Sequence, residues 1–136
     1  MERERNWKTG EGLLGISDPA EVDAAFDRNE PHVGTAVIGL VLNSDALSIA
    51  APRVLRALRS DNPRVRQFGF VAVGDAARKF QKLTPELYAA LREEGLGGAA
   101  DTAIKDVLTF VPYRELPWWL KRLGVTLRVK NLLFRR

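Results

Sequence analysis

The chain has 136 residues, with 21 Lys and Arg against 17 Asp and Glu, a formal net charge of +4, no Cys and one His. This length allows one ordinary domain with its own apolar core. The lack of Cys excludes disulfides, thiolate metal ligands and Cys nucleophiles, and the single His32 excludes any metal site built on a pair of histidines.

Residues 1–17 are rich in charge and contain no apolar run of the length found in secretory signal peptides. We therefore expect a polar N-terminal arm. The longest apolar stretch, residues 33–42, is interrupted by Gly and Thr and falls far short of the ~20 residues that span a bilayer. These features favour a cytoplasmic protein without a transmembrane segment.

Three helix starts share one pattern, in which a capping side chain is followed by Pro at the first helical position. They are Asp18-Pro19, Asn62-Pro63 and Thr84-Pro85. With the apolar spacing that follows, the sequence predicts helices at 19–28, 31–43, 46–59, 63–80, 85–94 and 97–111. Residues 18–111 show no alternation of apolar and polar residues that would predict a strand.

The predicted helices repeat in pairs. Pro31-His32-Val33 lies 32 residues before Pro63-Arg64-Val65, each opens a strongly apolar helix, and a less regular copy follows Gly95. Each of these apolar helices comes after a more amphipathic one. A helix pair that cannot bury its apolar face alone, stacked three times, is typical of an α-solenoid. We therefore predict an all-α fold in which residues 18–111 form about three antiparallel helix pairs.

The segment Leu55–Arg66, LRALRSDNPRVR, resembles the junction between the two helices of a HEAT repeat. The resemblance implies an amphipathic helix, a short turn containing Asp and Pro, a second helix opened by Val65-Arg66, and an Arg that reaches back to a neighbouring acid. In size and pattern the whole chain resembles small actinobacterial HEAT-like immunity proteins. That resemblance implies a protein that binds and neutralises a toxin.

Residues 112–136 form a different segment, which we predict to be a basic, aromatic C-terminal extension with a net charge of +6. Two prolines interrupt the preceding helix, and residues 118–123 have the spacing of one or two amphipathic helical turns that end before Gly124. Residues 125–130 then alternate apolar and polar side chains, a strand-like pattern.

Acidic and basic residues are segregated along the chain. Residues 11–45 carry a net charge of −6, residues 46–82 of +6, and residues 83–111 of −3. Alternating blocks of this kind favour attraction between neighbouring helix pairs and surfaces of opposite sign outside them.

The charged and aromatic residues provide candidates for partner binding. These are Asp23, Asp27, Glu30, Arg56, Arg59, Arg64, Arg66, Trp118 and Trp119. The arginines are interpreted either as a solvated face paired with acids of the preceding repeat or as a basic binding surface. The two tryptophans are interpreted as a cap on the last helix pair, a partner hot spot or a membrane-interface anchor.

The sequence contains no recognisable catalytic constellation, phosphate-binding loop, cofactor motif or metal-ligand spacing. We therefore expect no enzymatic activity and no cofactor. The leading hypothesis is a protein–protein interaction module, with an immunity protein against a toxin as its sharpest form. The alternative is a protein that binds nucleic acid or an anionic membrane through Arg53–Lys82 and the basic C-terminal extension.

Overall fold

The computed structural model describes residues 5–134, with side chains described for residues 5–126. This part of the chain contains seven α-helices, two short 3-10 helices and no strand, so the predicted all-α class is confirmed. The α-helices are α1 (Pro19–Asp27), α2 (Val33–Asn43), α3 (Leu47–Leu58), α4 (Pro63–Phe80), α5 (Pro85–Glu94), α6 (Asp101–Phe110) and α7 (Trp118–Phe134), and the 3-10 helices are η1 (Leu13–Gly15) and η2 (Tyr113–Glu115).

The three predicted helix starts are confirmed in atomic detail. The Asp18 carboxylate accepts a hydrogen bond from the Ala20 amide at 3.0 Å, the Asn62 side chain from the Arg64 amide at 2.9 Å, and the Thr84 hydroxyl from the Leu87 amide at 3.3 Å. Each bond satisfies an amide that the helix itself leaves unpaired.

The strand-like interpretation of residues 125–130, and the expected end of the helix before Gly124, are wrong. The backbone of α7 continues through Gly124 to Phe134, and the Thr126 hydroxyl donates to the Arg122 carbonyl at 3.0 Å, one turn earlier. A helix satisfies its own backbone groups, whereas a strand at this position would need a neighbouring strand, and none exists in residues 5–134.

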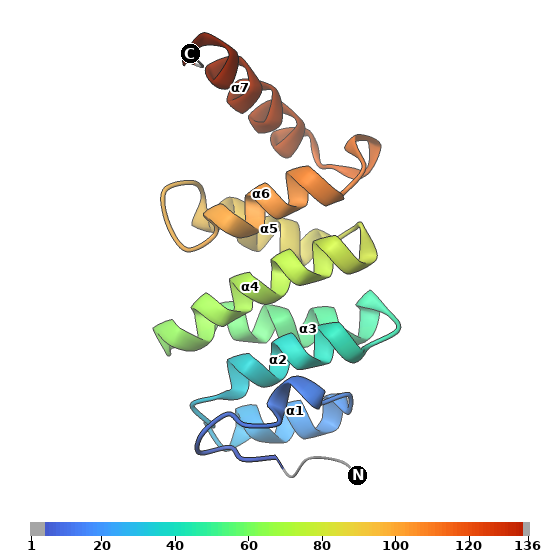
Figure 1. The fold of residues 1–136 in the computed structure, drawn as a ribbon, viewed down its shortest axis with the longest axis vertical. Helices are drawn as coiled ribbons and strands as arrows, with labels where there is room; N and C mark the ends of the chain where they lie inside the picture. The colour runs from blue at the N-terminus through green and yellow to red at the C-terminus, as the bar shows by residue number, and fades with distance from the viewer. Residues whose placement is uncertain (1–4, 135–136) are drawn as a thin grey trace.

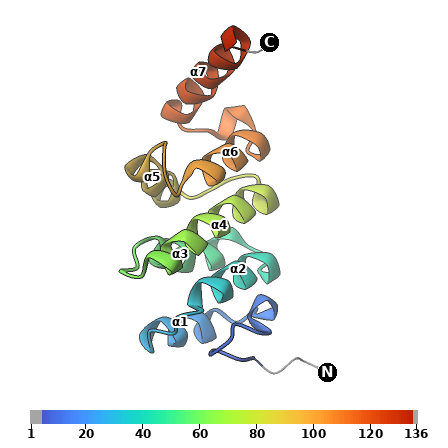
Figure 2. The same ribbon diagram turned by 60° about the vertical axis from the view of Figure 1, so that its left-hand side comes forward.

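The helices lie in two layers along an elongated molecule. Figure 2 shows α1, α3 and α5 on one side and α2, α4 and α6 on the other. Within the first layer α3 contacts both α1 and α5, and within the second layer α4 contacts both α2 and α6. Between the layers, α3 contacts α2 and α4. The apolar core runs between the layers, and α7 lies at the opposite end of the molecule from α1 (Figure 1).

The N-terminal segment differs from the polar arm expected from the sequence. Leu13 and Ile16 have no exposed surface, and η1 packs directly on α2. The Asn43 amide nitrogen donates to the carbonyls of Leu14 and Ile16 at 2.8 and 3.0 Å, which ties the segment to the end of α2. Two apolar residues three positions apart are too short a pattern to predict this burial from sequence.

Candidate partner-binding groove

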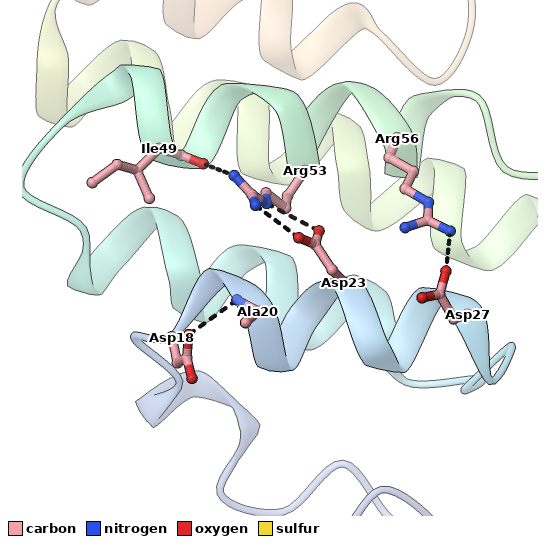
Figure 3. Close-up of polar contacts among 7 residues, drawn as sticks. All are labelled: Asp18, Ala20, Asp23, Asp27, Ile49, Arg53 and Arg56. Atoms are coloured by element: carbon pink, nitrogen blue, oxygen red, sulfur yellow. Dashed lines mark hydrogen bonds and ion pairs between the residues drawn. The ribbon is translucent and has the colours of Figure 1, made fainter.

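A bidentate ion pair joins the outer surfaces of α1 and α3. Arg53 donates from Nε to Asp23 Oδ1 at 3.0 Å and from Nη2 to Asp23 Oδ2 at 2.7 Å, while its Nη1 donates to the Ile49 carbonyl (Figure 3). The hydrogen bond from Arg53 holds the pKa of Asp23 below its usual value, against an opposing effect of burial. The same bond raises the pKa of Arg53.

A second ion pair lies one helical turn further along the same two helices. Arg56 Nη2 donates to Asp27 Oδ1 at 2.9 Å (Figure 3). The Arg56 guanidinium also lies 4.7 Å from the centre of the Phe26 ring. Of the two interpretations of the arginines, the one in which they pair with acids earlier in the chain is therefore confirmed for Arg53 and Arg56.

Asp23→Asn is expected to lower the free energy of unfolding at pH 7 by about 0.5–1 kcal/mol, because it removes the bidentate ion pair with Arg53. The effect is modest because solvent partly screens the two charges. The pKa of Asp23 is lower in the folded protein than in the unfolded chain. The contribution of the pair is thus complete above the unfolded pKa and is lost as the pH falls through the folded pKa. Urea unfolding of both proteins from pH 7 to about pH 2 should show their stabilities converging.

Asp27→Asn is the matched control. The Asp27 side chain is 72% exposed and accepts one hydrogen bond from Arg56, so its replacement should change the stability by less than about 0.5 kcal/mol. Equal losses at the two positions, or a deficit of Asp23→Asn that persists at acid pH, would contradict the assignment.

A groove of about 530 Å³ lies between the end of α1, the second half of α3 and the turn into α4. Apolar and partly apolar side chains form much of its wall, and four charged side chains belong to its lining, one of which is Asp61. The apolar members are Phe26, Val33, Pro52, Leu55 and Val65, and the predicted site residues in the lining are Glu30, Arg56 and Arg59. We call this feature the α1–α3 groove.

Two predicted arginines lie outside the lining of the α1–α3 groove. Arg64 is exposed on the first turn of α4, with its guanidinium 5.7 Å from the centre of the Phe68 ring. Arg66 Nη1 donates to the Ser60 carbonyl at 2.8 Å, which braces the turn between α3 and α4. The role of Arg66 is therefore local, rather than the pairing with an acid that the HEAT resemblance implies.

The two predicted tryptophans lie at the other end of the molecule and have different environments. Trp118 is 58% exposed, and its ring has the guanidinium groups of Arg92 and Arg122 at 5.3 and 5.7 Å. Trp119 is partly buried against the core. One tryptophan thus covers the core while the other faces solvent. Four cations of the predicted basic extension have side chains outside the described part, namely Arg128, Lys130, Arg135 and Arg136.

One pair of carboxylates lies between α4 and α6. Burial raises the pKa of Asp75, Arg78 opposes this shift, and the charge of Asp106 adds to it. The Asp106 carboxylate packs against the backbone at Gly74. Among the described side chains, no group of three or more His, Cys, Asp or Glu residues is arranged to hold a metal ion.

Sequence reasoning missed the apolar wall of the α1–α3 groove. Phe26 and Leu55 have the spacing of core residues on amphipathic helices, and both do pack against the core from partly buried positions. Nothing in the sequence distinguishes a partly covered core residue from one that lines a groove, because the distinction depends on how α1 sits against α3.

Comparison with family models, with curated proteins and with solved structures found no match to this chain. No helix among residues 5–134 has both the length and the apolar composition needed to cross a membrane.

Proposed function

We propose that this protein is a non-enzymatic interaction module that binds another protein through the α1–α3 groove. The observation that carries the proposal is an apolar groove wall next to Arg59, which forms no ion pair with either acid of the described lining, Glu30 or Asp61. Arg59 lines the groove, is exposed, and has no ion-pair partner among the described side chains. Burying apolar side chains supplies binding free energy, and an unpaired cation at the rim selects a partner segment that carries an acid.

We further propose that the two layers of helices form a short HEAT-like α-solenoid of three antiparallel pairs, α1 with α2, α3 with α4 and α5 with α6. The support is the contact pattern: α1 touches α2 and α3 touches α4, while α3 touches both α1 and α5, and α4 touches both α2 and α6. An α-solenoid presents an extended surface suited to a protein partner. In its sharpest form the function is that of an immunity protein, in which the bound partner is a toxin.

The test uses the full chain, purified under native conditions from its own host, with wild type compared with two charge reversals. Arg59→Glu should reduce the recovery of the dominant co-purifying protein about tenfold. Lys82→Glu, an equal charge change at another exposed position, should leave the recovery unchanged. If the partner is a toxin, co-expression with wild type should restore growth of cells that produce it, and Arg59→Glu should restore growth poorly. A chain that purifies alone, or a partner retained by Arg59→Glu, would refute the proposal.

Binding of nucleic acid or an anionic membrane through Arg53–Lys82 and the C-terminal extension is the alternative. Half of the eight cations in this block are engaged within the fold: Arg53 and Arg56 with carboxylates, Arg66 with a carbonyl, and Lys79, whose Nζ donates to the carbonyls of Val41, Leu42 and Ser44. We therefore expect no retention on heparin or anionic liposomes at ~0.15 M salt. Retention that falls steeply with salt would favour the alternative instead.

A further inference from the structure

A second groove, of about 600 Å³, lies at the C-terminal end between α6, η2 and α7. Its floor is strongly apolar, since Val111, Leu116 and Leu120 are all buried. Its rim includes Tyr113 and Val125, which are 60% and 52% exposed. We call it the α6–α7 groove. It contains none of the residues that line the α1–α3 groove, so it is a separate surface.

The groove is open because the described first turns of α7 are covered on one side only. Trp119, Leu120 and Leu123 face the core from the first turns of α7. Trp118 and Val125, seven residues apart and therefore on one side of the helix, are exposed. An apolar floor beneath exposed large side chains is the kind of surface on which another helix packs.

Gly124 is a feature of the α6–α7 groove that favours a helical occupant. It lines the groove in the interior of α7, where Gly costs about 0.5–1 kcal/mol relative to Ala. A Cβ at this position would meet only Leu108 Cδ2, at the ordinary contact distance of 3.4 Å. The lack of a side chain therefore leaves room above the floor for another backbone to approach closely.

The charge of the rim decides the chemistry of the occupant. Lys121 lines the groove with its Nζ 5.1 Å from the centre of the Tyr113 ring, and Arg114 and Arg122 are exposed nearby in sequence. Among residues 112–126 the acid is Glu115 alone. Two copies of α7 facing each other would bring these cations together, which disfavours a second copy as the occupant. A lipid surface would meet the exposed rim but would not fill a recessed floor.

We propose that the α6–α7 groove binds an amphipathic helix of a protein partner, with the apolar face of that helix on the groove floor and its acidic flank beside Lys121. This is the helix-in-groove mode of recognition, in which apolar side chains at positions i, i+3, i+4 and i+7 supply contact area and flanking charges supply orientation. The proposal does not depend on the function assigned to the α1–α3 groove.

The probe is a displayed library of helical peptides with randomised surface positions, selected on the full-length protein. We expect the enriched peptides to carry one apolar face and a net negative charge. Their binding should weaken at least about tenfold with Gly124→Leu, which fills the groove, and with Lys121→Glu, which reverses its rim charge. Lys82→Glu and Arg59→Glu should bind these peptides as tightly as wild type does. A loss of peptide binding at the α6–α7 groove can therefore be distinguished from a loss of partner binding at the α1–α3 groove.

Circular dichroism and urea unfolding check that each variant is folded. Tyr113→Glu, at a position 60% exposed, replaces Gly124→Leu if the latter does not fold, and should weaken binding in the same way. Enriched helices that bind Gly124→Leu or Tyr113→Glu as tightly as wild type, or that are neutral or basic, would overturn the proposal. Vesicles containing anionic lipid provide the other arm: binding to them that is lost with Lys121→Glu but kept with Gly124→Leu would assign a lipid surface instead.

Discussion

Leu13→Ala is expected to lower the free energy of unfolding by about 2–5 kcal/mol, the range for removing a fully buried Leu side chain. Leu13 has no exposed surface and belongs to the core cluster, although it lies in a segment that the sequence predicts to be a polar arm. The loss combines the transfer free energy of the removed methyl groups with the cavity left between η1 and α2. Urea unfolding followed by circular dichroism measures the difference.

Leu14→Ala is the matched control, because it removes the same atoms from the adjacent residue. Leu14 is 52% exposed, so its replacement should change the stability by no more than about 0.5 kcal/mol. Similar small effects at both positions would mean that residues 1–17 do not belong to the folded core in solution. A large effect at Leu13 alone establishes that the core begins before α1.

Gly39→Ala is expected to destabilise the protein by about 1–3 kcal/mol, although Ala is the better helix former. A Cβ at position 39 would lie 2.5 Å from the Leu13 carbonyl oxygen and 2.9 Å from the Cα of Leu14. These are backbone atoms of η1, so no change of side-chain rotamer relieves the contact. To accept the methyl group, η1 must move away from α2.

Gly15→Ala provides the control for this substitution. A Cβ at position 15 would have no atom within 4 Å among those considered, so the same chemical change should be neutral or slightly stabilising. Equal stability of Gly39→Ala and Gly15→Ala, measured by urea unfolding, would show that η1 does not contact α2 as closely as the structure has it.

These two predictions concern the contact between η1 and α2, which joins residues about 25 positions apart in the chain. The sequence alone does not predict this contact. Gly39 reads in the sequence as an interruption of an apolar helix, with a cost relative to Ala. In the structure it is the position that lets η1 approach α2. Neither Gly39 nor Leu13 carries a local signal of the other, so their contact follows only from the packed arrangement.

The candidate site was predicted in part. The pairing of Arg53 and Arg56 with acids of the preceding helices follows from charge blocks of opposite sign separated by about one repeat, and Asp23 and Asp27 lie 30 and 29 residues before their partners. Grouping Glu30, Arg56 and Arg59 around one groove depends on the angle at which α1, α3 and the turn into α4 meet. Arg64 and Arg66 belong to the same basic block, yet they lie outside that groove.

The sequence by itself determined the helical class and the starts of α1, α4 and α5. It could do so because a capping side chain, the Pro that follows it and the first-turn amides lie within a few residues of one another. Only the tertiary structure decided the burial of Leu13, the continuation of α7 past Gly124 and the two grooves. These features depend on contacts between distant segments or on the lack of a neighbouring strand, and local pattern carries no information about either.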